Sequence, residues 1–432
     1  MNELLLGLDV GTSAVKAAVI GRDGAEVASG SAPTPWRAVP TGAELDPDAL
    51  LAAAVRAAGA ALAGAPDGPV AGIGVAGMAE TGVLLDARGR PVVPSIAWHD
   101  SRGDEEVRRI AAELGADTFA ERTGLPLTRL PTLPKYAWMR AHWPESARGV
   151  RWLNVAEWIV RGLGGEEVTE ASLASRTGFY DLHAGAVWDA ALAWAGAPAG
   201  LAPPHAPAGT PAGAAGHAAL PRARGAVLAV GGHDHLAAAV GAGAAGTDDV
   251  LDSCGTAEAW VRTSAPLPPE KVCEATAGGI TVGRHAVAGR HALLGSVRSG
   301  AVLQAVLDLL GVPAEKRDEL ERAALDSDPG ELTLAGFKGE GLTIAGVGAG
   351  ASPAALYRAA LESLGAAGAE IMARMEAVAG PARRLVVTGG WAAGEAARAV
   401  KARHLGPFEH LPEVSTGARG AAIAAGRAAQ LS

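Results

Sequence analysis

The hydrophobic pattern of the first twenty residues predicts a β-hairpin with polar groups at its turn. An apolar run at residues 4–8 ends at Asp9, small residues follow at 10–13, and a second β-prone run returns at 15–20. The turn offers backbone N–H groups and two hydroxyls beside a carboxylate, and such groups can cradle phosphate oxygens and hold Mg²⁺. Neither GxxxxGK[ST] nor GxGxxG occurs in this stretch, so it is neither a P-loop nor a dinucleotide fingerprint. An ordinary surface hairpin stays open as the alternative.

Short apolar runs and amphipathic segments alternate along the rest of the chain. Apolar or β-prone runs predict strands at residues 25–29, 70–75, 83–86, 95–100, 226–230 and 384–388. Helical periodicity predicts helices at residues 47–63, 103–114, 236–243, 300–310, 352–378 and 417–430. The Pro-, Ala- and Gly-rich stretch 197–220 predicts a loop or linker.

A second strand–turn–strand segment, residues 249–261, repeats the order of the first hairpin. Its D-x-x-G-T-A, beginning at Asp252, echoes D-x-G-T-S-A at Asp9. An echo half a chain apart suggests two domains of related design, although so short a match could arise by chance. We therefore expect domains at residues 1–243 and 244–432.

Composition narrows the class of protein. A chain of 432 residues, 49% of them hydrophobic, is too long for one average core and can bury two. The net charge of −9, without a basic stripe, argues against nucleic acid as a partner. Two cysteines, Cys254 and Cys273, exclude a disulfide framework and match no zinc spacing. No apolar run could span a membrane and no leader signal is visible, so we expect a soluble, cytoplasmic protein.

Six motifs, in order, resemble the FGGY family of carbohydrate kinases within the actin-like ATPase superfamily. They are the Asp9 hairpin, WHDSR at 98–102, GGHDH at 231–235 with the following helix, the Asp252 hairpin, GSVRSGAVLQ at 295–304, and Gly-Gly at 389–390 before a helix. The resemblance covers nearly the whole chain. It implies an α/β fold of two ribonuclease-H-like domains with mixed central sheets and a cleft between them. It also implies ATP and Mg²⁺ as cofactors and a small sugar or polyol as acceptor.

The resemblance also assigns roles to single residues. Asp234 resembles the general base, although an Asp there could simply cap the following helix. Asp9 resembles the residue that holds Mg²⁺. The predicted nucleotide-binding residues form three groups: a first phosphate loop with Gly11, Thr12, Ser13 and Lys16; a second with Gly255, Thr256, Ser299 and Gly300; and an adenosine site with Gly389, Gly390 and Gly394.

Acceptor residues are implied by the loop after the strand at 70–75 and by the WHDSR segment. Glycerol kinases carry Arg-Glu-Thr where this chain has Ala79-Glu80-Thr81, so the carboxylate of Glu80 is matched and the Arg is missing. An exposed loop glutamate is the alternative. The predicted acceptor-binding residues are Met78, Ala79, Glu80, Trp98, Asp100, Asp234 and His235. This mixture suits a pentulose, a hexulose or a sugar alcohol.

Other functions compete with a kinase. His233 and His235 flank Asp234 and could hold a metal ion, but no fourth ligand is evident. A non-catalytic, sugar- or nucleotide-binding regulatory relative would be free to lose the base, whereas this chain retains Asp9, Lys16 and Asp234. A chaperone-type ATPase would need a peptide-binding domain that is missing. The chain is shorter than many family members, which leaves a homodimer open.

Overall fold

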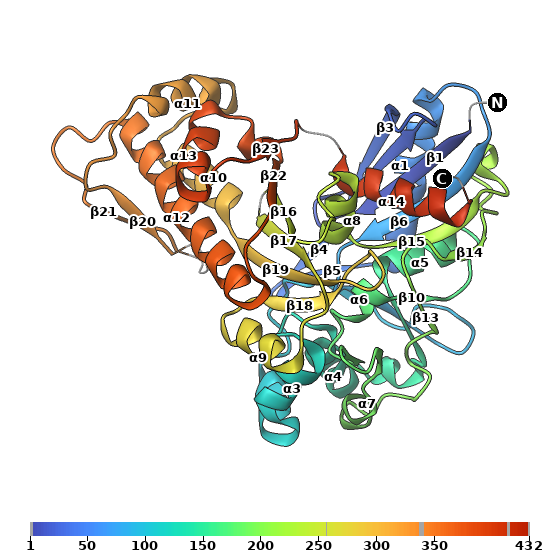
Figure 1. Ribbon diagram of the computed structural model, residues 1–432. Helices are drawn as coiled ribbons and strands as arrows, with labels where there is room; N and C mark the ends of the chain where they lie inside the picture. The colour runs from blue at the N-terminus through green and yellow to red at the C-terminus, as the bar shows by residue number, and fades with distance from the viewer. Residues whose placement is uncertain (1–2, 256, 337–340, 413–414, 431–432) are drawn as a thin grey trace. The chain divides into compact units, whose positions relative to one another are not determined.

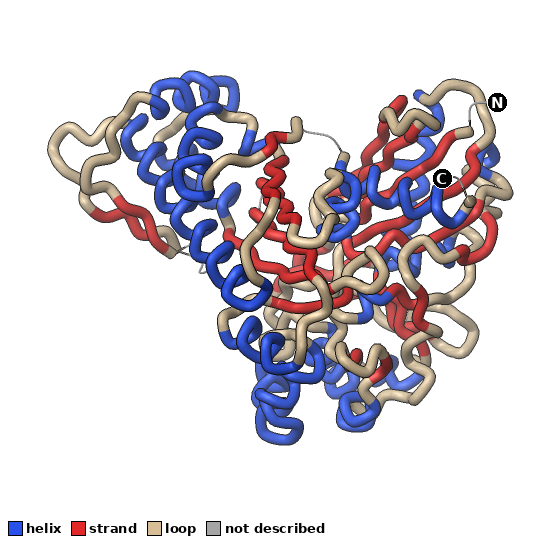
Figure 2. Tube along the Cα trace, viewed as in Figure 1, coloured by secondary structure: helices blue, strands red, loops and turns tan. Residues whose placement is uncertain are grey.

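The protein forms two compact units. The computed structural model describes residues 3–255, 257–336, 341–412 and 415–430 (Figures 1 and 2). The first unit contains residues up to 243 together with 265–292 and the segment from 415 onward, and the second contains 244–264 and 293–414. Two segments that the sequence analysis assigns to a C-terminal domain, 265–292 and the last helix, therefore pack with the first unit.

A six-stranded mixed sheet forms the centre of the first unit. Its strand order is β14(Pro211–Ala214), β15(Val227–His233), β6(Val70–Gly77), β1(Leu4–Val10), β2(Ala14–Ile20) and β3(Glu26–Pro33). β1, β6 and β15 are parallel, whereas β2, β3 and β14 join antiparallel. The predicted hairpin is confirmed, with Asp9 opposite Lys16.

The prediction of a loop throughout residues 197–220 is wrong at β14. Its sequence, Pro-Ala-Gly-Ala, has no β-branched or aromatic residue and so carries no local strand signal. Pairing of Pro211 with Ala229 and of Ala214 with Val227 in β15 makes it an edge strand. Tertiary pairing, which the local sequence does not encode, creates this element.

Helices cover both faces of this sheet. Alternate residues of β2 point to opposite faces: Val19 packs in the core that includes α1(Pro47–Gly64) and α5(Val155–Gly162), whereas Ile20 packs against α14(Thr416–Ala428). α8(Asp234–Gly241) lies beside α14 on the second face (Figure 1). The predicted helices at 47–63, 236–243 and 417–430 are confirmed to within two residues at each end.

Glycines of the sheet let α14 approach the strands closely. A Cβ on Gly7 would lie 1.8 Å from the carbonyl oxygen of Ala418, and one on Gly74 would lie 1.8 Å from that of Ala421. Helix and sheet are therefore in backbone contact, which only glycine permits. The small-residue composition of the chain reflects this packing.

The remaining elements of the first unit are short. They are β4(Arg37–Val39), β5(Gly42–Leu45), β7(Gly82–Leu85), β8(Ser95–Ile96), α2(Asp104–Ile110), η1(Ala111–Gly115), α3(Ala116–Thr123), α4(Thr132–His142), η2(Pro144–Arg148), β9(Arg151–Asn154), β10(Thr169–Glu170), α6(Ala171–Ala174), β11(Tyr180–Asp181), β12(Ala186–Val187), α7(Asp189–Trp194), β13(His205–Ala206), η3(Pro221–Ala223), α9(Pro269–Ala277) and β18(Thr281–Arg284).

The second unit is also built on a mixed sheet. Its strands run in the order β19(His291–Val297), β17(Glu258–Ser264), β16(Asp249–Cys254), β22(Arg384–Thr388) and β23(Glu409–His410). β16 pairs antiparallel with β17 and parallel with β22, so the second predicted hairpin is confirmed.

Four helices of this unit share one apolar core: α10(Ser299–Leu309), α11(Arg317–Leu325), α12(Pro353–Ala379) and α13(Glu395–Leu405) (Figure 1). The other elements are η4(Ala314–Lys316), β20(Thr333–Ala335), β21(Thr343–Ala345) and η5(Gly390–Ala392). Across the described part of the chain, no helix combines the length and hydrophobicity needed to cross a membrane.

Candidate functional site

Three parallel strands of the first unit end at the same level of the sheet. Val10 and His233 both pair with Gly77. The residues around these ends, Asp9, the loop after Gly77, and Asp234, therefore gather at the carboxyl edge of the sheet, where ligands of α/β proteins commonly bind. The topology thus brings the predicted base, the predicted metal ligand and part of the predicted acceptor loop to one edge.

The turn after Asp9 is held from two directions by side chains. The Trp36 indole N–H donates to the carbonyl oxygen of Thr12 at 2.7 Å, and the Thr34 hydroxyl donates to that of Gly11 at 2.7 Å. The indole of Trp98, predicted to bind the acceptor, donates to the Thr12 hydroxyl at 2.9 Å. Trp98 therefore supports the predicted phosphate loop. Sequence reasoning missed Thr34 and Trp36, which only the pairing of β2 with β3 brings here.

The Asp9 carboxylate lacks the partners that a buried charge needs. Burial, followed by the charge of Asp234, raises its pKa to about 7, and Lys16 opposes that rise. Its Oδ1 is buried and has no hydrogen-bond partner among the described residues. A Cβ on Gly417 would lie 2.3 Å from its Oδ2, so the first turn of α14 closes on this carboxylate. An orphaned carboxylate oxygen beside a second acid fits a divalent cation.

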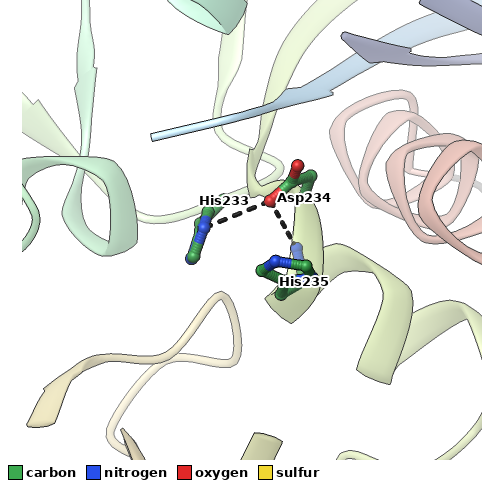
Figure 3. Close-up of side chains that lie close together, drawn as sticks. All are labelled: His233, Asp234 and His235. Carbon is green, nitrogen blue, oxygen red and sulfur yellow. Dashed lines mark hydrogen bonds and ion pairs between the residues drawn. The ribbon is translucent and has the colours of Figure 1, made fainter. Parts of the chain in front are cut away.

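Asp234 begins α8 and is fixed by its neighbours in sequence (Figure 3). Its Oδ1 accepts the backbone N–H of His235 at 2.8 Å and lies 3.1 Å from Nε2 of His233. Its second oxygen points away from both imidazoles. The helix cap is His233, so the alternative role of Asp234 as N-cap does not apply.

The two acids at the sheet edge differ in pKa. Burial raises the pKa of Asp234, but His235, His233 and the Arg176 guanidinium together hold that pKa below its usual value. Burial lowers the pKa of His233 to about 3, so its imidazole is neutral near pH 7. Asp234 is thus an ionised, partly buried carboxylate, and its charge state is the one that a general base needs.

A polar chain behind the base anchors its backbone. The Ser172 hydroxyl accepts the His233 N–H at 2.9 Å and donates to Oε2 of Glu170 at 2.5 Å. Burial raises the pKa of Glu170 to about 7. A Cβ on Gly232, whose φ is 100°, would lie 2.8 Å from the Ser172 hydroxyl. These residues come from β10 and α6, far from Asp234 in sequence, and carry no local signal.

Glu80 is buried, which contradicts the alternative of an exposed loop residue. Its relative exposure is 7% and its φ is 65°, in the left-handed region. Arg176 contacts its Oε1 through Nε at 2.7 Å and Nη2 at 2.6 Å. The Thr132 hydroxyl donates to its carbonyl oxygen at 3.0 Å. Arg176, which sequence reasoning did not find, thus supplies a positive charge beside Glu80.

Two further predicted acceptor residues, Met78 and Ala79, are buried at 2% and 1% exposure within the main core of the first unit. The Met78 N–H donates to the carbonyl oxygen of Val10 at 2.9 Å. Their side chains pack the core beneath the loop, so only their backbone is left to meet an acceptor.

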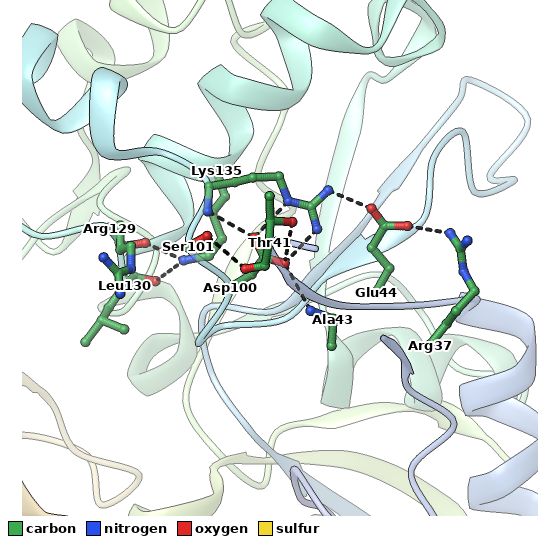
Figure 4. A network of polar contacts seen from close by, with 10 residues as sticks. Arg37, Thr41, Ala43, Glu44, Asp100, Ser101, Arg129, Leu130 and Lys135 are labelled. Atoms are coloured by element: carbon green, nitrogen blue, oxygen red, sulfur yellow. Dashed lines mark hydrogen bonds and ion pairs between the residues drawn. The ribbon is translucent and has the colours of Figure 1, made fainter. Parts of the chain in front are cut away.

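Asp100 is the predicted acceptor residue that the structure supports least. Its side chain is fully buried, and both carboxylate oxygens bind Arg102, at 2.8 Å each. Oδ2 also accepts from the Thr41 hydroxyl and from Ala43 N–H (Figure 4). Arg102 continues to Glu44 at 2.6 Å. The carboxylate has no oxygen left for a hydroxyl, so Asp100 stabilises the loop rather than contacting a ligand.

The predicted loops of the second unit also come together. A Cβ on Gly300 would lie 2.2 Å from the carbonyl oxygen of Gly255, and one on Gly389, at φ 103°, would lie 2.5 Å from that of Cys254. The hydroxyl of Ser299 is buried without a partner among the described residues. Thr256 lies outside the described residues. Three glycine-containing segments thus lie in backbone contact with little side-chain bulk between them.

The other two glycines predicted to bind adenosine, Gly390 and Gly394, lie in different surroundings. Gly390 accepts from Nη2 of Arg317 at 3.0 Å, and that guanidinium lies 4.1 Å from the ring centre of Trp391. A Cβ on Gly394 would lie 2.2 Å from the carboxyl carbon of Glu321. Gly394 therefore makes room for Glu321 of its own unit. This packing explains the glycine at this position without a bound nucleotide.

The Asp252 hairpin resembles the Asp9 hairpin in sequence, but its aspartate has a different charged partner, Lys401. Nζ of Lys401 lies 2.6 Å from Asp252 and 2.5 Å from Glu258. Asp252, Cys254 and Glu258 have metal-ligand chemistry and spacing, as do His233, Asp234 and His235. In the first group the ammonium already stands between the two carboxylates, so a cation there would have to displace it.

Comparison with known proteins agrees with the geometry. The family model described as FGGY family of carbohydrate kinases, N-terminal domain, matches residues 4–241, and the C-terminal domain model matches 253–429. A xylulose kinase of Streptomyces coelicolor is 36% identical over 249 residues, covering 56% of this chain and only 50% of the relative. A glycerol kinase of Aromatoleum aromaticum is 30% identical over 454 residues, covering 98% of this chain and 89% of the relative.

A solved structure gives the same result for the fold. Xylulose kinase from Rhodospirillum rubrum superimposes with a TM-score of 0.87 at 27% identity, covering 98% of this chain and 89% of that one. The expected two-domain fold with mixed sheets is thereby confirmed. Together with the two family models, these matches show that the chain belongs to the FGGY family of carbohydrate kinases.

Proposed function

We propose that this protein is an ATP-dependent carbohydrate kinase that phosphorylates a hydroxyl of a ketose or a sugar alcohol. The observation that carries the proposal is the pair of carboxylates at the sheet edge. Asp234 is ionised and fixed by His233 and His235, whereas Asp9 has a buried oxygen without a partner among the described residues. Phosphoryl transfer needs a base for the acceptor and a cation for the phosphates, and two acids in different environments can divide these tasks.

Asp234 is the general base of the proposed reaction. The acceptor hydroxyl gives its proton to a carboxylate oxygen while its own oxygen bonds to the γ-phosphorus and the bond to the ADP oxygen breaks. The contacts from His233 and His235 fall on Oδ1, so Oδ2 is the oxygen offered to the acceptor. Because His233 is neutral, it orients the carboxylate without competing for the proton.

Asp9 is the residue proposed to hold Mg²⁺, directly or through water. A bound Mg²⁺ would neutralise charge on the transferring phosphates. Gly11, Thr12 and Ser13 contribute a turn with small side chains, and Lys16 lies opposite Asp9 on the neighbouring strand. In the second unit, the residues proposed to bind nucleotide are Gly255, Ser299, Gly300, Gly389 and Gly390.

Glu80 and His235 are proposed to bind the acceptor. A carboxylate can accept hydrogen bonds from two hydroxyls of a polyol. Relatives named xylulose kinase and glycerol kinase have a ketose and a polyol in their names, which supports an acceptor rich in hydroxyls. Trp98 stays a predicted acceptor contact through its ring face, because its N–H is already used on Thr12.

Replacement of Asp234 tests the proposed base. Asp234→Ala should lower kcat for acceptor phosphorylation at least about 10²-fold, because general-base catalysis contributes roughly 10²–10⁴-fold. Affinity for ATP, measured by calorimetry, should stay within about twofold. Asp104→Ala, at an exposed position on α2, is the matched control and should keep full activity. An Asp234→Ala variant with near-normal kcat would refute the assignment.

A further inference from the structure

We propose that Arg176 is the positioning residue of the acceptor site, holding Glu80 so that one carboxylate oxygen faces the acceptor. The proposal rests on the function proposed above and adds a residue to it. Arg176 lies just beyond α6, 96 positions from Glu80 in sequence, and reaches Glu80 through its side chain.

The contact between the two side chains is asymmetric. Nε of Arg176 donates to Oε1 of Glu80 at 2.7 Å, and Nη2 lies 2.6 Å from the same oxygen as an ion pair. Oε2 of Glu80 has no hydrogen-bond partner among the residues that the structure describes. The charge-assisted hydrogen bond and the ion pair together hold Oε1 in place. The other oxygen is then left to accept from a hydroxyl in a defined direction.

Glu80 needs such support because its backbone is strained. A non-glycine residue at φ 65° costs roughly 1 kcal/mol or more and persists only where its surroundings impose it. The Thr132 hydroxyl holds the Glu80 carbonyl and Arg176 holds its side chain. Strain maintained from both ends is typical of a side chain presented to a ligand.

Arg176 is itself anchored in the segment that supports the base. Its N–H donates to the carbonyl oxygen of Leu173 at 3.0 Å. In the same segment, Ser172 accepts from His233 N–H and Ser175 accepts from Arg284 N–H, each at 2.9 Å. One short stretch therefore fixes the turn that carries Asp234 and the residue that clamps Glu80. This stretch therefore fixes the position of Asp234 relative to the Glu80 carboxylate.

Lys135 is the other cation near Glu80 and does not take this role. Its Nζ donates to the carbonyl oxygens of Arg129 and Leu130, the second at 3.3 Å. Burial lowers its pKa to about 8. Its hydrogen bonds stabilise the start of α4, which leaves Arg176 as the cation hydrogen-bonded to Glu80.

A double-mutant cycle tests the proposal. Arg176→Ala should raise KM for the acceptor at least tenfold, leave KM for ATP within twofold, and lower kcat less than KM rises. Arg176→Lys, which keeps the positive charge but lacks the planar guanidinium, should give an intermediate KM for the acceptor. If Arg176 acts through Glu80, then the acceptor KM of the double variant Arg176→Ala/Glu80→Ala should be less than twofold higher than that of Glu80→Ala alone. Arg122→Ala, which breaks a partly exposed pair with Asp181, is the control and should leave all constants unchanged.

The outcomes separate this inference from the proposed function. Additive effects in the double variant, or an unchanged acceptor KM in Arg176→Ala, would overturn the role of Arg176 while leaving the kinase proposal intact. If Arg176→Ala fails to fold, the intermediate KM expected for Arg176→Lys decides: wild-type KM in that variant overturns the proposal. A wild-type protein that neither binds an acceptor without ATP nor forms ADP with one would contradict the proposed function itself.

Discussion

The two acids at the carboxyl edge of the first sheet show how position determines chemistry. Asp9 and Asp234 are both partly buried, yet the pKa of Asp9 rises to about 7 while that of Asp234 falls below its usual value. Histidine rings and a backbone N–H face Asp234, whereas one oxygen of Asp9 meets no donor among the described residues. The same residue type thus supplies a base in one place and a cation ligand in the other.

At the residue scale, Trp98→Phe tests whether the indole supports the first phosphate loop. The substitution keeps an aromatic ring and removes the 2.9 Å hydrogen bond to Thr12. Loss of about 1 kcal/mol from such a bond should raise KM for ATP roughly fivefold. Trp194→Phe, which removes an exposed indole bond to Glu113, is the control. A change in acceptor KM alone would instead place Trp98 in the acceptor site.

Single residues were predictable from sequence where a local motif carried them. Asp9 lies at the end of a strand, Asp234 and Glu80 follow one, each within a recognisable segment, and all three lie at the same sheet edge. Trp36, Ser172 and Arg176 were not predictable, because each reaches the site through tertiary contacts from a segment without a motif. For Asp100 the sequence was misleading: the residue lies in a family motif, but both oxygens of its carboxylate bind Arg102.

At the element scale, the contact between α14 and the sheet depends on glycine. Gly74→Ala should lower the free energy of unfolding by about 3 kcal/mol, because the new Cβ would lie 1.8 Å from the Ala421 carbonyl oxygen. Gly216→Ala makes the same change where no atom lies within 4 Å and should alter stability by less than about 1 kcal/mol. Urea unfolding followed by circular dichroism measures both, and equal stability of the two variants would contradict the close packing.

Glu157, in the first turn of α5, should make the free energy of unfolding depend on pH. Burial raises the pKa of Glu157 from 4.5 to about 8, so the folded protein holds that proton more tightly than the unfolded chain. Its stabilising contribution is complete below pH 4.5 and is lost as the pH rises toward 8, by at most about 1.4 kcal/mol per pH unit.

Glu157→Gln removes this titration. Between pH 5 and pH 8, its free energy of unfolding should fall less steeply than that of the wild type. The exposed Glu166→Gln should keep the wild-type slope. Urea unfolding at several pH values measures these slopes, and parallel curves for wild type and Glu157→Gln would show that Glu157 stays ionised in the folded protein.

Elements with a strong period were predictable from sequence, and those made by pairing alone were not. The hairpins β1–β2 and β16–β17 and the long helix α12 follow their apolar patterns closely. β14 has no strand-forming residues, and β8 covers only two of the six residues expected at 95–100. In both cases the length of the strand depends on its partners in the sheet.

At the scale of the whole molecule, two units repeat one design with different charge. Each has a hairpin led by an aspartate at the centre of a mixed sheet. Lys401 contacts both Asp252 and Glu258 in the second unit, whereas Oδ1 of Asp9 in the first has no hydrogen-bond partner among the described residues. The repeat in sequence therefore predicts the repeat in fold but not this lysine, which no local pattern relates to Asp252.

The most direct measurement is ADP formation by the wild-type protein with ATP and Mg²⁺ across a panel of neutral sugars and polyols. The panel includes xylulose, ribulose, fructose, tagatose, erythritol and glycerol, with gluconate as a charged comparison. A carbohydrate kinase should show strong stimulation by one of these acceptors, which disappears in Asp234→Ala. ATP binding without stimulation by any member of the panel would contradict the proposed kinase activity and favour a binding-only relative of the family.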